Sequence, residues 1–152
     1  MILAAIDIGS NAARLLISEA SVYKDGSVDY TKLTLLRIPL RLGFDVFSKG
    51  HITDKKRKKL VDTIKIYKLL MDIYEVEDFK ACATSAMRDA TNGPDIMREI
   101  VEETGIDIQI ISGMEEATIL YETHIADNLN TNKSYLYVDV GGGSTEVTLF
   151  AN

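Results

Sequence analysis

Apolar stretches dominate the first forty positions of the chain, and alternation at Leu33, Leu35, Ile38 and Leu40 has the period of two that predicts β-strands. We expect three strands, over residues 1–8, 14–23 and 28–42. The turn between the second and the third contains Asp25-Gly26, a hairpin signal. The alternation changes phase once between Leu35 and Ile38, which indicates a β-bulge. The chain therefore begins with an antiparallel three-stranded sheet.

A helical period follows the third strand. Thr53 is a suitable N-cap, and apolar residues recur at positions 60, 64, 67, 71 and 74. This spacing predicts an amphipathic helix over residues 54–74 that covers one face of the sheet.

Shorter elements alternate over the next fifty residues. We expect a strand over 78–83, a polar loop over 84–93, a helix opened by Pro94 and closed by Gly105, a strand over 106–111 and a helix over 112–127. The order βββαβαβα combines an antiparallel start with parallel crossovers. It places the chain in the α/β class, with a mixed five-stranded sheet flanked by helices.

The stretch from residue 127 to 133 is polar and rich in asparagine, as linkers are. We therefore divide the chain into a domain over residues 1–127, a linker over 128–134 and the opening β-hairpin of a truncated second domain over 135–152. A two-stranded hairpin is marginally stable alone. Either the chain is an excised fragment, or this hairpin docks on its own domain or on a neighbouring molecule.

One pattern occurs twice, as Asp7-Ile8-Gly9-Ser10-Asn11 and as Asp139-Val140-Gly141-Gly142-Gly143-Ser144-Thr145-Glu146. Each copy joins two apolar strands through a turn of small residues. Backbone N–H groups in such a turn can bind phosphate oxygens, because glycine tolerates positive φ and leaves the backbone accessible. The acid at the strand end can hold a divalent cation. Neither copy has the Walker lysine, so a metal ion, backbone dipoles or an arginine elsewhere must meet the phosphate charge.

Composition narrows the function classes. The formal net charge of -6 argues against a general nucleic-acid binder, and no apolar run is long enough to cross a membrane. Cys82 is the only cysteine, so we expect a cytoplasmic protein without intrachain disulfides, and Cys82 itself fits an inert buried thiol. The basic run over residues 55–59 is either a contact for a polyanion or a solvated helix face.

Two adjacent acids open the helix predicted over residues 112–127. Ser112 and Glu115 fit a capping box, in which each side chain accepts a hydrogen bond from the other residue's backbone N–H. Glu115 is therefore assigned a structural role. Glu116 lies about 100° further round the helix and takes no part in this cap. It is either a general base toward a water molecule or an ordinary acid favoured by the helix dipole.

Arg88 follows the strand predicted over residues 78–83, where α/β sheets usually place ligand groups. Its planar guanidinium suits phosphate oxygens. The alternative is a surface salt bridge with Asp89 or Glu99.

Four segments together resemble the signature blocks of the exopolyphosphatase and guanosine pentaphosphate phosphohydrolase (Ppx/GppA) family: residues 7–11, 83–93, 111–117 and 139–146, in the family's order. The resemblance implies the actin-like ATPase (ribonuclease H-like) fold, with two related domains and the active site between them. It also implies Mg²⁺-dependent removal of the terminal phosphate of inorganic polyphosphate, or of the 5′ γ-phosphate of guanosine pentaphosphate (pppGpp).

The resemblance also implies residue roles. Glu116 matches the catalytic base, and Asp7, Asp139 and Glu146 match acids that hold the metal ion or position the water. The matching phosphate contacts are Gly9, Ser10, Asn11, Arg88, Gly141, Gly142, Gly143, Ser144 and Thr145. Ala12 departs from the family, which often has a second hydroxyl residue there. We expect a homodimer of the full-length protein, and little or no activity from this chain alone, because most of the second cleft wall is missing.

Two other functions stay open from the sequence. One is a kinase-type phosphotransferase of the same fold. The other is a non-catalytic module that binds phosphate or a guanosine tetra- or pentaphosphate. Within the first hypothesis, the sequence does not separate polyphosphate from pppGpp as the main substrate.

Overall fold

A computed structural model describes residues 1–120, 133–143 and 145–150 of the chain. Its centre is a five-stranded sheet with the order β3-β2-β1-β4-β5. The strands are β1 (Ile2–Ile8), β2 (Ala12–Val22), β3 (Val28–Pro39), β4 (Asp78–Ala83) and β5 (Gln109–Ile110). The first three pair antiparallel, whereas β4 runs parallel to β1 and to β5. The predicted mixed sheet is confirmed.

The third strand contains the expected bulge, but at a different position from the predicted one between Leu35 and Ile38. Ile17 pairs with Thr34 and Ser18 pairs with Lys32, so Leu33 is the extra residue. Between Leu35 and Ile38 the pairing is regular. The change of phase there arises because β3 carries apolar residues on both of its faces.

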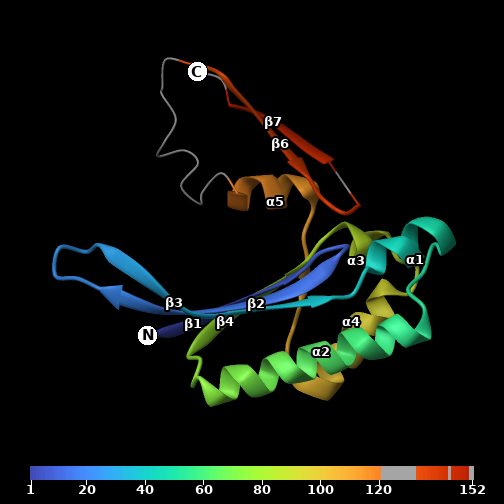
Figure 1. Ribbon diagram of the computed structural model, residues 1–152, viewed down its shortest axis with the longest axis horizontal. Coiled ribbons are helices and arrows are strands. Elements are labelled where there is room, and N and C mark those ends of the chain that lie inside the picture. Colours follow the sequence, from blue (N-terminus) through green and yellow to red (C-terminus); the bar gives the residue numbers. More distant parts are fainter. Residues whose placement is uncertain (121–132, 144, 151–152) are drawn as a thin grey trace.

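Two helices cover one face of the sheet, α2 (Asp54–Ile73) and α4 (Gly93–Thr104) (Figure 1). Their buried side chains, Leu60, Ile64, Tyr67 and Met71 of α2 and Ile96 and Ile100 of α4, join the core with Ile6, Ile8, Leu15 and Ile17 of the sheet. Alternation along β1 therefore leaves Asp7 on the opposite face. Thr53 is the N-cap of α2 as predicted, although its hydroxyl donates to Asp45 Oδ2 at 2.5 Å and does not cap the helix.

The structure corrects three predicted segments. Helix α1 (Leu42–Lys49) was missed, and α3 (Ser85–Asp89) replaces part of the loop predicted over residues 84–93. Both helices are short, and burial of a few apolar side chains by the rest of the fold stabilises them more than local propensity does. The strand predicted over residues 106–111 pairs only at Gln109–Ile110.

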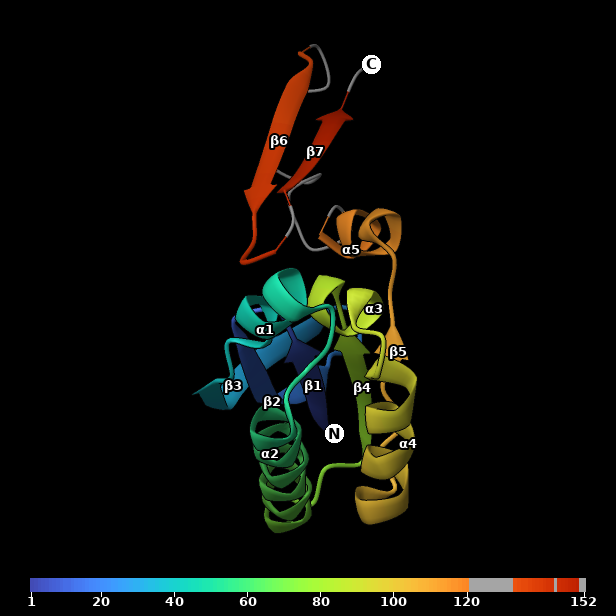
Figure 2. The same ribbon diagram turned by 90° about the vertical axis from the view of Figure 1, so that its right-hand side faces the viewer.

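Helix α5 (Gly113–Leu120) lies on the face of the sheet opposite α2, and beyond it β6 (Tyr135–Val140) and β7 (Thr145–Phe150) form a separate hairpin (Figures 1 and 2). The remainder of the predicted helix 112–127, and linker residues 128–132, lie outside the described residues. The hairpin exposes an aliphatic row made of Leu136, Val138, Val140, Val147 and Leu149. Among the described helices, none combines the length and apolarity that a membrane span requires.

Candidate active site

Both Asp-x-Gly turns lie at one end of the five-stranded sheet, where α5 also begins (Figure 1). Together they border a cleft of about 300 Å³. It is lined by Asp7, Gly9, Ser10, Asn11, Ala12, Arg14, Arg37, Thr84, Ser85, Glu116, Val140, Gly141 and Gly142. Segments more than a hundred residues apart in the sequence therefore share one site.

The first turn is a tight hairpin connection held from two sides. The Gly9 N–H donates to the Ala12 carbonyl at 3.0 Å, which closes the turn between β1 and β2. The hydroxyls of Ser10 and Ser85, both buried, lie 2.8 Å apart and form a hydrogen bond. Ser85 opens α3, so this bond connects the turn to the end of β4. The position of Ser10 is thereby fixed relative to the parallel part of the sheet.

Close approach accounts for two glycines of the second turn. Among the described glycines, those at positive φ are Gly26, Gly50 and Gly105, none of which belongs to either turn. A Cβ added to Gly142 would lie 3.2 Å from Asn11 Cβ, tighter than ordinary contact, and one added to Gly143 would overlap the Phe47 ring. A Cβ on Gly9 would make only an ordinary contact, at 3.5 Å from the Ala12 carbonyl.

The second turn is described only in part. Gly141 and Gly142 line the cleft, whereas Thr145 is exposed at the start of β7 and lies outside the lining. Asp139 and Glu146 stand directly opposite each other in the hairpin register. Ser144 and the side chains of Asp139 and Glu146 lie outside what the structure describes, so their predicted roles stay predictions.

Two arginines that the sequence analysis missed line the cleft. Arg14 pairs with Asp7 in the β1–β2 register and with Arg37 in the β2–β3 register. Its Nη1 donates to Asp7 Oδ2 at 2.8 Å. Arg37 forms no ion pair with any residue that the structure describes. Two guanidinium groups thus face the carboxylates of the lining.

The bulge in β3 is responsible for this arrangement. Near the hairpin end Val22 pairs with Val28, and without the extra residue the same register would place Leu36 opposite Arg14. Leu33 shifts the register by one, so Arg37 takes that place and its side chain turns to the cleft face. The sequence did contain a signal for Arg14. A hairpin centred on the turn between β1 and β2 places Arg14 directly opposite Asp7.

Glu116 reaches the cleft from the first turn of α5, and it is half-buried there. Its neighbour Glu115 forms the predicted capping box. The Ser112 N–H donates to Glu115 Oε2 at 2.7 Å, and the Glu115 N–H donates to Ser112 Oγ at 3.2 Å. Hydrogen bonds from Ser112 also lower the pKa of Glu115. The cap thus directs one acid to the helix end and leaves the other at the cleft, as predicted.

Arg88 lies outside the residues that line the cleft. Its Nη1 donates to the Ile111 carbonyl at 3.0 Å, and its Nε lies 3.7 Å from Asp89 Oδ1. Ile111 directly precedes the cap of α5, so Arg88 connects α3 to the segment that carries Glu116. The alternative partner Glu99 instead forms an ion pair with Arg57. Direct contact of Arg88 with phosphate stays a prediction.

The donor set of the cleft suits a hard cation. The carboxylates of Asp7 and Glu116 both line it, and carboxylate oxygens are ligands that Mg²⁺ accepts. Arg14 binds one oxygen of Asp7, which leaves the other for a ligand. Within the described residues no three potential ligand side chains come together. The described part of the site therefore fits one or two protein contacts to Mg²⁺, as is common where phosphates supply the remaining ligands.

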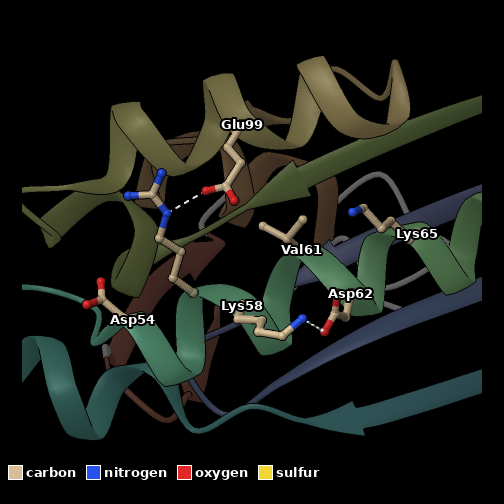
Figure 3. A pocket seen from close by; sticks show the side chains of 7 residues that line it. Asp54, Lys58, Val61, Asp62, Lys65 and Glu99 are labelled. Atoms are coloured by element: carbon tan, nitrogen blue, oxygen red, sulfur yellow. Dashed lines mark hydrogen bonds and ion pairs between the residues drawn. The ribbon is translucent and has the colours of Figure 1, made fainter.

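The basic run over residues 55–59 is largely engaged within the domain. A hollow of about 440 Å³ between α2 and α4 is lined by Arg57, which bonds Glu99, and by Lys58, which pairs with Asp62. Figure 3 draws the side chains that line it. Lys56 pairs with Asp45 at 2.9 Å, and Lys59 donates to the Pro39 carbonyl at 2.6 Å. These contacts favour the structural interpretation of the run over a polyanion site.

Comparison with known proteins identifies the family of the chain. A sequence model of the Ppx/GppA phosphatase family matches residues 21–152. Exopolyphosphatase 1 of Mycobacterium tuberculosis is 31% identical over 97% of this chain and 42% of its own length. A bifunctional 3-dehydroquinate synthase/phosphatase of Fusobacterium nucleatum is 35% identical over 96% of this chain and 22% of its own length. The chain thus spans less than half the length of these relatives.

Solved structures of exopolyphosphatases and Ppx/GppA phosphatases have the same fold as this chain. An exopolyphosphatase from Cytophaga hutchinsonii has a TM-score of 0.83 at 27% identity, covering 99% of this chain and 47% of that one. The Aquifex aeolicus Ppx/GppA phosphatase has a TM-score of 0.77 at 29% identity, covering 99% and 48%. The fold is therefore the actin-like ATPase type that these structures share.

Proposed function

Because the chain belongs to the Ppx/GppA phosphatase family, we propose that its cleft binds the terminal phosphate of inorganic polyphosphate or the 5′ γ-phosphate of pppGpp for hydrolysis. The observation that carries the proposal is that Glu116 and residues of both turns line the same cleft. An acid that served only to stabilise the helix dipole would not need to lie at this cleft. Glu116 instead lines the cleft that both turns border, which supports the proposal that it activates a water molecule toward a bound phosphate.

In the proposed reaction, Glu116 accepts a proton from a water molecule whose oxygen attacks the terminal phosphorus in line with the bridging oxygen. A new P–O bond forms as the bond to the bridging oxygen breaks. The shortened chain leaves with that electron pair, and Glu116 returns its proton to solvent. Positioning and charge stabilisation supply most of the rate enhancement in such a transfer.

Arg14 and Arg37 supply positive charge to the cleft from the protein itself. Two guanidinium groups and the carboxylates of Asp7 and Glu116 give the described lining no net formal charge, although the whole chain carries -6. A polyanion can therefore enter without meeting uncompensated carboxylates. Arg37 presents the planar donor pattern that suits phosphate oxygens, and Arg14 also holds Asp7 in place.

We propose Mg²⁺ as the cofactor, held by Asp7 with Asp139 and Glu146 from the second turn. A bound Mg²⁺ would neutralise charge that develops on the phosphate oxygens. For Gly9, Ser10, Asn11 and Gly141 to Thr145 we keep the predicted phosphate contacts. The hydroxyls of Ser10 and Ser85 bond each other, with either one as the donor, and we propose the Ser10 backbone N–H as a further donor to a phosphate.

The whole protein's properties follow as proposals. We propose that residues 1–127 form one domain, that 128–134 link it to a second domain beginning at 135–152, and that the full-length protein is a cytoplasmic homodimer. The cleft would then lie between the two domains. We propose that this chain alone binds phosphate chains but hydrolyses them slowly or not at all.

Titration of the chain with tripolyphosphate in the presence of Mg²⁺ tests the proposal. We expect saturable binding, and a Kd about tenfold higher for Arg37→Ala, which corresponds to roughly 1.4 kcal/mol. Arg98→Ala is the matched control, because Arg98 is an exposed arginine of α4 paired with Asp95 away from the cleft. No saturable binding by the unmodified chain, or equal weakening by both variants, would contradict the proposal.

A further inference from the structure

Helix α1 is attached directly to the first turn. The Leu40 and Arg41 N–H groups both donate to the Asn11 carbonyl, at 3.0 and 2.8 Å. The Gly43 N–H donates to the Ser10 carbonyl at 2.8 Å. Two consecutive carbonyls of the turn are therefore bound by the start of one helix. Any displacement of α1 would displace the turn with it.

One side chain of α1 extends from this attachment to the second turn. A Cβ added to Gly43 would lie 2.8 Å from Phe47 Cε2, so the ring packs on the helix backbone one turn before it. A Cβ added to Gly143 would overlap the Phe47 ring and lie 2.7 Å from Ser10 Oγ. The ring is thus in contact with two glycines, Gly43 of its own helix and Gly143 of the second turn.

Phe47 is not part of the hydrophobic core of the sheet domain. The buried residues of α1 are Leu42, Gly43, Asp45 and Val46, whereas Phe47 is 49% exposed. Half of this ring stays in contact with water, and its contacts at Gly43 and Gly143 remove part of its apolar surface from solvent. Its neighbour Phe44 is 75% exposed and lies under Lys56 Nζ, 5.4 Å from the ring centroid, so Phe44 has a separate partner.

We propose that Phe47 is a positioning residue that sets the separation of the two phosphate turns. The inference rests on the proposed function, because the separation matters only if both turns bind one phosphate chain. A flat ring with two side-chain torsions, in contact with the backbone at Gly43 and at Gly143, is a stiff spacer. Phosphate oxygens must be held to within about 0.5 Å for efficient binding and transfer. Shortening this side chain lets the turns approach or separate without unfolding either one.

Four single variants and one double variant of the chain test the proposal through tripolyphosphate affinity with Mg²⁺. We expect Phe47→Ala to raise the Kd about tenfold and Phe47→Leu to raise it less, since leucine keeps part of the apolar bulk without reaching beyond the ring. Phe44→Ala is the matched control from the same helix and should stay within about twofold. Gly143→Ala, whose methyl group would press on the ring, should weaken binding as well. Combined with Phe47→Ala, it should cost less than the sum of the two single losses.

A binding-independent measurement separates this proposal from the proposed function. In NMR spectra of the chain, the Phe47 ring should give nuclear Overhauser contacts to the Gly143 α-protons, and these protons should shift when Phe47 is replaced but not when Phe44 is. If the contacts are seen and tripolyphosphate does not bind, the proposed function fails while the spacer contact stands. The positioning role is overturned by absence of the contacts, by undiminished affinity of Phe47→Ala, or by strictly additive losses in the double variant.

Discussion

Asp45 carries a stability prediction that can be worked out from the structure. Its carboxylate is 3% exposed and lies between α1 and α2. Burial alone would raise the pKa of this carboxyl. Hydrogen bonds from the Thr53 hydroxyl and N–H, at 2.5 and 3.2 Å, together with Lys56 at 2.9 Å, outweigh burial and lower the pKa from 3.8 to about 2. Folding therefore favours the charged form.

The sign and size of the pH effect follow from this shift. A carboxyl with a depressed pKa in the folded state stabilises the fold above its unfolded pKa, and that stability is lost as the pH falls through the folded pKa. Here the loss runs from about pH 5 to below pH 2. A shift of nearly two units at about 1.36 kcal/mol per unit gives roughly 2 kcal/mol. For a chain of this size, that corresponds to about 4–8 °C in Tm.

Urea unfolding followed by circular dichroism at pH 7, 5, 3 and 2 measures this contribution. We expect Asp45→Asn to lower the free energy of unfolding by about 2 kcal/mol at pH 7, and the difference from the unmodified chain to shrink to about 0.4 kcal/mol at pH 2. Asp62→Asn is the control, because its exposed pair with Lys58 contributes at most about 1 kcal/mol. Parallel pH curves for the unmodified chain and Asp45→Asn would refute the reasoning, whatever the cost at pH 7.

Two further predictions concern the C-terminal part. Glu115→Ala removes half of the capping box, so thermal unfolding should show a loss of about 1 kcal/mol in the free energy of unfolding. Tripolyphosphate affinity should stay within twofold. A large loss of affinity would mean that the box does more than cap α5. The exposed aliphatic row of the hairpin should make this chain associate at high concentration. Sedimentation should show Val138→Lys, placed opposite Val147 in that row, to be monomeric; association unchanged by this variant would place the interface elsewhere.

Features set by local chemistry were predictable from the sequence. Pro94 and Gly105 bound α4 as expected, with Gly105 at φ 71°. The capping box at Ser112 and Glu115 also formed as predicted, because its partners lie three residues apart. Both examples depend on backbone rules that act within a few residues. The class of the fold followed from the order of such elements.

Features set by register and by packing were not predictable in the same way. Arg37 reaches the cleft only because one extra residue, Leu33, shifts the pairing of β3, and apolar alternation gave no unambiguous position for that bulge. Helix α1 is held by the first turn more than by its own sequence, so Phe47 could not be connected with Gly143 before both were placed in space. Such contacts join segments across the whole chain.

Cys82 shows an intermediate case. The expectation of an inert thiol agrees with its environment, because burial raises the pKa of Cys82 and so disfavours the reactive thiolate. The side chain is only partly buried, however, because Cys82 pairs with Asp7 and so lies on the sheet face opposite α2 and α4, whereas its neighbours Ala81 and Ala83 are buried. The sequence predicted the chemistry of this residue better than its degree of burial.

Phosphate release from polyphosphate by the full-length protein tests the central claim, that Glu116 is the base in a phosphate cleft. With Mg²⁺ present, we predict that Glu116→Gln lowers kcat by at least about 100-fold with little change in KM, because the substitution keeps the shape and removes the proton acceptor. Glu115→Gln, one residue away in the helix cap, should retain turnover to within a few-fold. Undiminished turnover in Glu116→Gln, or equal losses in both variants, would contradict the account.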